Sequence, residues 1–463
     1  MPDKKTPPTK NPELSLEIVD IALPDGYGVG KKGTFVFFVH GAVVGDQVMI
    51  RITKEDKRFS YGEIVKIEKP SPFRCAPQCP HFGLCGGCVL QHLTYEKQLE
   101  IKENHLRQTL GRIGGIDISA LDIMPIAPSP EQYFSRNKIE LAFGKDKNHI
   151  TLGFRERVNP AEEYKGRVIP VKTCPIFSNA AEIIIPLVLH FVKKHGLLPY
   201  DPLTKKGFLR HLVIREAKST GDLMVILETV KGELPGMGDL WRPLSEALPK
   251  VKSLYRVINT RATDTGLYEE EEHLFGERSI EESIGNLRFN VYPQSFFQPN
   301  TRVAEMLYRT IIDLSEPGIN DRVLGLYCGA GPIELFLSSK VREVTGIDSN
   351  PSNIASAREN CRLNHIENCT FIQGRLERFR ERLPLDPDIL IIDPPRGGIS
   401  KEGLTIIMGL KPEKIVYVSC NPSTLARDIQ YLKEHHYSPK RVASFDAFPH
   451  TTHLESVTLI EKM

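Results

Sequence analysis

Short apolar runs separated by turn residues fill the first part of the chain. They cover residues 16–19, 34–39, 47–52 and 61–67, and the glycine-rich stretch 26–30 has the composition of a turn. Strands at this spacing, within about 60 residues, are typical of small closed barrels of the OB type. The pattern therefore predicts such a barrel over residues 14–72. The preceding residues 1–13 are rich in Lys, Pro and Thr and predict a disordered tail.

The last third of the chain alternates apolar runs of strand length with stretches of helical period. Over residues 291–463 this alternation predicts an α/β domain, a doubly wound parallel sheet of the Rossmann-like kind. Residues 93–124 predict a helical segment that packs on this domain, with Leu99, Leu106 and Leu110 close to one face. Residues 125–290 are β-rich and irregular, with strand candidates at 139–143, 211–215 and 223–227.

Composition indicates what kind of protein this is, but it does not indicate which reaction the protein catalyses. The 463 residues, 40% of them hydrophobic, are enough for roughly two to four ordinary domains. A net charge of +2 is too balanced to indicate nucleic-acid binding, and charge alone fits an RNA-binding barrel and a merely solvated one equally. No run of 18 apolar residues occurs, and the N-terminus lacks the apolar core of a signal peptide. We therefore expect a cytoplasmic protein without membrane partners, and a monomer.

Cysteines are concentrated in one short segment. Of nine in the chain, Cys75, Cys79, Cys85 and Cys88 fall within fourteen residues, and Cys174 stands alone before Pro175. In a cytosolic chain such crowding indicates metal binding or catalysis rather than disulfides. Cys79, Cys85, Cys88 and Cys174 suit either zinc or a four-iron cluster, and the three-plus-one spacing favours iron–sulfur. Cys75 is then a spare, and residues 73–92 with 125–290 form the predicted iron–sulfur domain.

A glycine turn follows the first strand of the α/β region. The apolar run 323–326 leads through Tyr327 to Gly329 and Gly331, and these glycines let a ligand approach the backbone. Nineteen residues after Gly329, Asp348 ends the next strand, a spacing that suits a carboxylate bonded to ribose hydroxyls. The chain has neither Gly-x-Gly-x-x-Gly nor Gly-Lys-Ser/Thr. A mononucleotide-like cofactor or S-adenosylmethionine is therefore favoured over a dinucleotide or triphosphate.

Three reactive side chains lie at or near the ends of strand-like runs in the same region. Cys420 follows the run 415–418 and precedes Asn421-Pro422, Asp393 follows the run 389–392, and Glu455 precedes a further run. Ligands of open α/β sheets bind at such strand ends. We interpret Cys420 as a nucleophile and Glu455 as a general base. The plainer alternatives are a buried apolar cysteine and a surface carboxylate.

Taken together, these motifs resemble the RNA uridine-5-methyltransferase family, in the branch with a TRAM barrel and a four-iron cluster that acts on 23S ribosomal RNA. The segments 79–88, 295–300, 393–396, 419–422 and 446–455 match in order, over nearly the whole chain. The resemblance implies an S-adenosylmethionine-dependent enzyme that methylates carbon 5 of a uridine in structured RNA, through a Cys420 adduct. Its implied residues are Cys79, Cys85, Cys88 and Cys174 for a [4Fe-4S] cluster; Gln298, Tyr327, Asp348 and Asp393 for the cofactor; Phe296 for base stacking; and Cys420 with Glu455 for catalysis.

Two further positions stay open. Phe296 is equally interpretable as a core residue beside Phe297. The segment 133–138, which includes Arg136, either contacts RNA or is a plain loop.

Three positions depart from the family pattern. Gly325 stands where the family has an acid, Pro332 where it has a small or polar residue, and Arg375 where Asn or Asp is common. These changes raise the question of how strongly the cofactor binds. They motivate a second hypothesis, a catalytically weakened paralogue that binds RNA. A redox sensor built on the cluster is a third, and transfer RNA is an alternative substrate.

Overall fold

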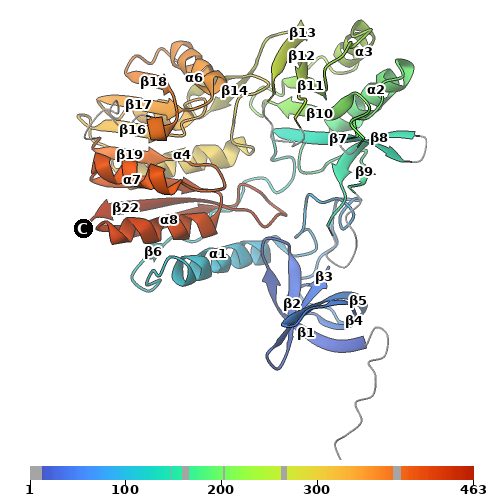
Figure 1. Cartoon of the computed structure of the whole chain (residues 1–463), viewed down its shortest axis with the longest axis horizontal. Helices are drawn as coiled ribbons and strands as arrows, with labels where there is room; N and C mark the ends of the chain where they lie inside the picture. The colour runs from blue at the N-terminus through green and yellow to red at the C-terminus, as the bar shows by residue number, and fades with distance from the viewer. Residues whose placement is uncertain (1–12, 147–148, 159–165, 202–203, 262–267, 379–386) are drawn as a thin grey trace, which may run out of the picture. The chain divides into compact units, whose positions relative to one another are not determined.

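The computed structural model describes the chain except for residues 1–12, 147–148, 159–165, 202–203, 262–267 and 379–386 (Figure 1). The described residues form two compact units. One draws on residues 1–105, 154–169 and 450–452, and the other on residues 106–153, 170–449 and 453–463. The predicted tail lies outside the described residues, apart from Glu13, which begins the first strand. The finer domain boundaries given above stay a prediction.

No helix among the described residues is long and apolar enough to cross a membrane.

The first unit contains a closed five-stranded barrel, as the sequence predicts. Its strands follow the order β1-β2-β3-β5-β4 (Figure 1): β1 (Glu13–Ala22), β2 (Tyr27–Lys32), β3 (Phe35–His40), β4 (Gln47–Glu55) and β5 (Phe59–Lys69). Leu16, Ile18, Val39, Val48 and Ile50 fill its interior.

The prediction of a turn at residues 26–30 is wrong, because most of this stretch is strand β2. A Cβ on Gly28 would lie 2.7 Å from Ala42 Cβ, so this glycine lets the chain after β3 pack closely against β2.

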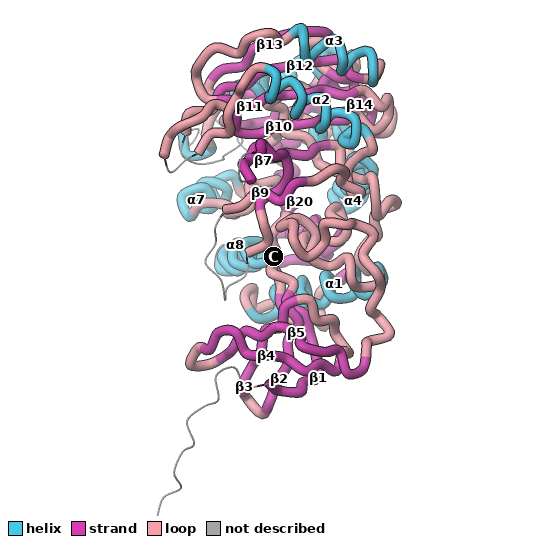
Figure 2. Tube along the Cα trace, turned by 90° about the vertical axis from the view of Figure 1, so that its right-hand side faces the viewer, coloured by secondary structure: helices cyan, strands magenta, loops and turns pink. Residues whose placement is uncertain are grey.

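The second unit contains a seven-stranded sheet of order β13-β12-β11-β10-β7-β8-β9. Its strands are β7 (Lys138–Asp146), β8 (His149–Arg155), β9 (Val168–Pro170), β10 (Leu209–Glu216), β11 (Leu223–Thr229), β12 (Val251–Ile258) and β13 (Glu270–Gly276). Helices α2 (Ala180–Lys194) and α3 (Gly238–Ala247) lie across one face (Figure 2). The other face packs against the hairpin β14 (Ile280–Ile284) and β15 (Leu287–Val291), through Val213, Ile226, Tyr255, Ile280 and Val291.

An eight-stranded sheet of order β18-β17-β16-β19-β20-β22-β21-β6 completes the second unit. The strands are β6 (Asp122–Ile123), β16 (Arg322–Leu326), β17 (Glu343–Asp348), β18 (Cys369–Gln373), β19 (Ile389–Ile392), β20 (Lys414–Ser419), β21 (Tyr437–Phe445) and β22 (Glu455–Lys462). The helices are α4 (Thr301–Ser315), α5 (Pro332–Ser338), α6 (Pro351–Leu363), the 3-10 turn η1 (Leu376–Arg378), α7 (Lys401–Leu410) and α8 (Pro422–Glu434). Helix α1 (Tyr95–Arg112) begins in the first unit, and its residues from Leu106 onwards belong to the second.

Helices cover both faces of this sheet, which confirms the predicted doubly wound α/β class. Val323 on β16 packs with α4, α5 and α6, whereas its neighbour Leu324 packs with α7, α8 and the end of α1. Successive residues of a strand point to opposite faces, so the continuous apolar run of β16 supplies both cores. The sheet is not wholly parallel, because β22 runs antiparallel to β20 and to β21.

The barrel depends on one buried acid. The Asp46 carboxylate accepts hydrogen bonds from Val43 N (2.8 Å) and Ser71 N (2.9 Å) and pairs with Arg74. Burial alone would raise the pKa of Asp46, but the bonds from Arg74, Ser71 and Val43 outweigh it and hold the pKa below its usual value. The stabilisation from this carboxylate is therefore present above about pH 4 and is lost as the pH falls through the lowered pKa.

We expect Asp46→Ala to loosen the barrel, because two buried N–H groups lose their acceptor. The local opening free energy at the Val43 and Ser71 amides should fall by about 2–3 kcal/mol, measured by hydrogen exchange on the full chain. Glu68→Ala is the control, since this exposed carboxylate accepts only a surface bond from Ser15. Equal protection in both variants would contradict the role of Asp46.

Candidate active site

The candidate residues of the α/β region meet at one edge of the sheet. β16, β17, β19 and β20 run parallel, with Leu326 paired to both Ile347 and Ile392, and Ile392 paired to Tyr417. Tyr327, Asp348 and Asp393 each come one residue after a paired position, and Cys420 follows the end of β20. These four residues therefore lie at the carboxyl edge of the parallel strands.

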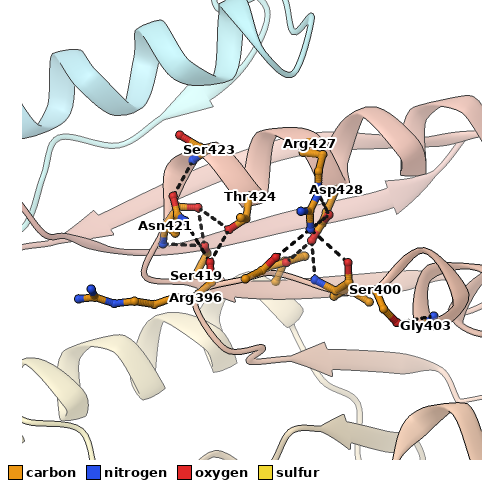
Figure 3. Close-up of polar contacts among 12 residues, drawn as sticks. Arg396, Ser400, Gly403, Ser419, Asn421, Ser423, Thr424, Arg427 and Asp428 are labelled. Carbon is orange, nitrogen blue, oxygen red and sulfur yellow. Dashed lines mark hydrogen bonds and ion pairs between the residues drawn. The ribbon is translucent and has the colours of Figure 1, made fainter. Parts of the chain in front are cut away.

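The two residues that flank Cys420, Ser419 and Asn421, are both held by hydrogen bonds (Figure 3). Asn421 caps helix α8 by accepting a hydrogen bond from Ser423 N (3.1 Å), and its own N–H donates to Ser419 Oγ (3.1 Å). Asn421 Nδ2 also donates to the carbonyl of Arg396 (3.0 Å). The Asn-Pro that follows the cysteine thus starts a helix and ties the thiol turn to the loop after Asp393.

Helix α8 also holds that loop directly (Figure 3). Arg427 Nη2 donates to the carbonyls of Gly397 and Ile399, both at 3.1 Å. The buried Asp428 carboxylate accepts from Ile399 N (2.9 Å) and from Tyr417 OH (2.7 Å). Asp428 therefore connects strand β20, helix α8 and the loop, which fixes the spacing between Asp393 and Cys420.

Glu455 lies beside Cys420 on the neighbouring strand. Ser419 of β20 pairs with Ser456 of β22, so the residues next to this pair, Cys420 and Glu455, adjoin across the two strands. Glu455 is only 4% exposed, which makes the surface-carboxylate alternative wrong. Cys420 is partly exposed, so it is not a fully buried core residue either.

Burial and like charges control protonation at this edge. Burial raises the pKa of Cys420 to about 11, helped by Glu455 and Asp393 and opposed by Arg396. Burial also raises the pKa of Asp393 to about 7. The pKa of Glu455 is raised well above its usual value by burial and by Asp393, while Arg396 lowers it. Arg396 is thus the cation that favours the ionised forms of both Cys420 and Glu455.

The glycine turn after β16 has the open backbone that the sequence predicts. Gly329 and Gly331 adopt φ of +55° and +81°. A Cβ on Gly329 would meet no atom closer than Phe296 Cδ1 at 3.8 Å, so the space above this residue is open. Asp348 accepts hydrogen bonds from Gly329 N (3.0 Å) and Asn350 N (2.7 Å), which orient its carboxylate next to the turn.

Tyr327 starts this turn with a left-handed backbone, at φ +62°, which is unfavourable for an aromatic residue. Burial raises the pKa of its hydroxyl to about 12, with Glu377 and Asp428 adding to the effect.

The loop before α4 presents Phe296 and Gln298. Phe296 is 56% exposed, whereas Phe297 packs into the core with its ring centroid 5.7 Å from that of Phe289. The core alternative is therefore wrong for Phe296, and its ring lies beside the Gly329 turn. Gln298 is 7% exposed.

Two residues that sequence reasoning missed hold this loop. Buried Arg215 of β10 donates through Nη2 to the carbonyls of Pro293 (3.0 Å) and Ser295 (2.8 Å). Asn137 Nδ2 donates to the carbonyl of Gln298 (2.7 Å). In the sequence, the feature that could have indicated this role is the position of Arg215, which ends the mostly apolar strand candidate 211–215.

Arg136 lies next to the segment that precedes Glu455. Its backbone N–H donates to the carbonyl of Ile176 (2.9 Å), and its guanidinium carbon lies 5.7 Å from the centre of the Phe448 ring. Arg375, in contrast, is exposed after β18.

The cysteine segment belongs to the first unit, and Cys174 belongs to the second. Burial raises the pKa of Cys85 to about 11, and the nearby thiols of Cys88 and Cys79 add to the increase. Gly87 N donates to Cys85 Sγ (3.3 Å), and a Cβ on Gly86 would come within 3.1 Å of the Arg155 carbonyl.

Among the described residues, Glu140, His211 and Glu228 form a group whose three ligand atoms lie within 4.8 Å of one another. Arg210 and Lys138 pair with the two glutamates of that group, which therefore forms a compensated ion-pair network.

Comparisons with known proteins agree with this geometry. A family model described as tRNA (Uracil-5-)-methyltransferase matches residues 236–463. The chain is 36% identical to an uncharacterized RNA methyltransferase of Clostridium tetani, over 99% of this chain and 98% of that protein. It is 33% identical to one from Bacillus cereus, over the full length of both.

Among solved structures, the tRNA (uracil-54, C5)-methyltransferase of Pyrococcus abyssi, in complex with S-adenosyl-L-homocysteine, has a TM-score of 0.74 and 30% identity. The match covers 96% of this chain and all of that one. Identity at this level across nearly the whole chain shows that the protein belongs to the RNA (uracil-5-)-methyltransferase family, whose members use S-adenosylmethionine.

Proposed function

We propose that this protein methylates carbon 5 of a uridine in 23S ribosomal RNA, through a covalent adduct between Cys420 and carbon 6. The observation that carries the proposal is the placement of Cys420 beside Glu455, at the sheet edge that also holds Asp393. A weakly nucleophilic uracil carbon needs a thiol nucleophile and a base, and this edge brings the two side chains together.

The donor set fits S-adenosylmethionine. Gly329 leaves the backbone approachable, and the oriented Asp348 carboxylate suits ribose hydroxyls. Gln298, Tyr327 and Asp393 complete the proposed pocket. When bound, the cofactor supplies an electrophilic methyl group that ends on carbon 5.

The protein's own part in the reaction has three steps. The Cys420 thiolate adds to carbon 6 of uracil, and the electron pair of the ring double bond moves so that carbon 5 becomes nucleophilic. After carbon 5 has gained the methyl group, Glu455 removes the proton that this carbon still carries. The electron pair of the broken carbon–hydrogen bond then re-forms the double bond between carbons 5 and 6, and the carbon–sulfur bond breaks to release Cys420 as thiolate. A carboxyl whose pKa is raised by burial is a stronger base once ionised, and Arg396 favours that form.

The target nucleotide must leave its stack to reach Cys420, which favours loops and single-stranded segments. Phe296 is exposed beside the cofactor turn and is placed to stack on such a base. We propose that Arg136 contacts the RNA near this point. The likeness to a tRNA (uracil-54, C5)-methyltransferase makes transfer RNA the second candidate substrate. Mapping 5-methyluridine in ribosomal and transfer RNA, with and without this protein, distinguishes the two.

We also propose that Cys79, Cys85, Cys88 and Cys174 hold a [4Fe-4S] cluster. The electrostatic effect of Cys79 and Cys88 on Cys85 supports it, and so does the hydrogen bond from Gly87 N–H to the Cys85 sulfur, because iron–sulfur sites carry such bonds. The cluster would supply structure to the RNA-facing part of the chain rather than chemistry at uracil.

Cys420→Ser should lower turnover by at least about a thousandfold, because a hydroxyl is a much poorer nucleophile than a thiolate at neutral pH. RNA containing 5-fluorouridine should trap the wild-type chain, since fluorine at carbon 5 cannot be removed as a proton. Glu455→Gln should accumulate the adduct on ordinary uridine. Denaturing gels with labelled RNA measure both, and a Cys420→Ser variant with unchanged turnover would falsify the mechanism.

Cys420 should react with iodoacetamide about tenfold faster for each pH unit between 7 and 9, because its raised pKa keeps the thiolate fraction small. Arg396→Gln removes a neighbouring positive charge, raises the thiol pKa further and should slow the reaction severalfold. Peptide-resolved mass spectrometry separates Cys420 from the other cysteines. The exposed Lys440→Gln is the matched control, and equal rates in both variants would rule out the charge effect.

Protein purified without oxygen should contain about four iron and four sulfide ions per chain. Cys85→Ser and Cys88→Ser should lose them, whereas Cys75→Ser should keep them. Zinc in place of iron, or loss of iron from the Cys75 variant, would contradict the proposed ligand set.

A further inference from the structure

The resemblance described above predicts an acid at position 325, where this chain has glycine. The structure shows what fills the space. A Cβ built on Gly325 would overlap Oε1 of Glu334, and it would lie 3.0 Å from the Cδ and 3.3 Å from the Cγ of that side chain. The carboxyl group of Glu334 therefore occupies the volume into which an acid at position 325 would project.

Glu334 is an unusual residue for its surroundings. It lies in the first turn of α5, directly after the glycine turn and Pro332, and is 1% exposed. Its Oε2 accepts no hydrogen bond from the described residues. A buried carboxyl oxygen without a partner is costly, and such groups are retained mainly where a ligand completes them.

The neighbours of Glu334 are acids and weak acids from every element around it. Its electrostatic partners are Asp348 at the end of β17, Asp393 after β19, Cys328 in the glycine turn, Cys361 on α6, Cys369 on β18 and Tyr308 on α4. Asp348 and Asp393 belong to the proposed cofactor pocket. Glu334 thus interacts electrostatically with two carboxyl groups of the proposed pocket for a cofactor that carries a sulfonium and an ammonium group.

We propose that Glu334 is a cofactor-binding acid, moved in this chain from strand β16 to helix α5. Its carboxylate supplies the negative charge for the cationic cofactor that Gly325 does not provide. The inference rests on the family's use of S-adenosylmethionine and not on which RNA is modified. It also removes the main reason to interpret the chain as a weakened paralogue, because the acid has changed position without being lost.

Proton release accompanies binding in this arrangement. Burial, with Asp393 and Asp348, raises the pKa of Glu334 to about 8, so without cofactor the group is mostly protonated at pH 7. A cationic ligand binds the ionised form better and so expels the proton. Affinity therefore rises as the pH increases towards 8, and each binding event releases a proton to the buffer.

Calorimetry with S-adenosylmethionine and S-adenosylhomocysteine tests the proposal on the full chain. Glu334→Gln keeps the side-chain volume and should weaken S-adenosylmethionine binding by about tenfold at pH 8. It should also flatten the rise in affinity between pH 6.5 and 8, and reduce the protons released, measured in two buffers of different ionisation enthalpy. The exposed Glu343→Gln on β17 is the matched control and should bind as the wild type does.

Two substitutions that move the acid from position 334 to position 325 distinguish a role of Glu334 in binding the cofactor from a role in packing alone. Gly325→Asp alone should lose binding, because the new side chain overlaps Glu334. Glu334→Ser alone should lose it because the charge is gone. The double variant, which places the acid on β16 and a small residue on α5, should recover affinity to within about threefold of the wild type.

Two results would overturn the proposal: a Glu334→Gln variant with wild-type affinity and pH dependence, or a folded double variant that binds no better than Glu334→Ser. Because Glu334→Gln is nearly isosteric, the first result decides the question even if the double variant does not fold. Failure here leaves the Cys420 chemistry intact, since trapping by 5-fluorouridine RNA measures that separately.

Discussion

The burial of ionisable groups at one sheet edge is the constraint on which the rest of the structure depends. Cys420, Asp393, Glu455 and Glu334 all have raised pKa values there, and in each case burial is the largest cause. Burial favours the neutral, protonated forms of these groups, because their ionised forms would lose the stabilisation that water gives. In the proposed function, a cationic cofactor at this edge would shift the groups near it towards their ionised forms.

Much of this site was predictable because strand ends are visible in a sequence. Cys420, Asp393 and Asp348 each end or follow an apolar run, and parallel strands bring such positions together whatever the rest of the fold does. The barrel and the doubly wound sheet were predictable for the same reason, since both depend on local periodicity. The stretch 26–30 was mistaken for a turn because glycine composition does not tell a turn from a strand that must be approached closely.

The residues that escaped prediction act over long sequence separations. Arg215 holds a loop about 80 residues away, and Asn137 reaches Gln298 across 161 residues. From the sequence, Gly325 suggested that an acid had been lost. A sequence shows which residue stands at a position, but it does not show which side chain from elsewhere in the chain fills the space beside it. Only coordinates reveal that Glu334 fills that volume.

The clamp formed by Arg215 has a consequence for how the two ligands influence each other. One guanidinium on the central sheet fixes the backbone on either side of Gln294, and this short loop carries both the exposed ring of Phe296 and the amide of Gln298. In the proposed function, the RNA and cofactor sites share this loop. If binding of one ligand orders the loop further, the entropic cost of binding the other falls, and by thermodynamic reciprocity the gain in affinity is the same in both directions.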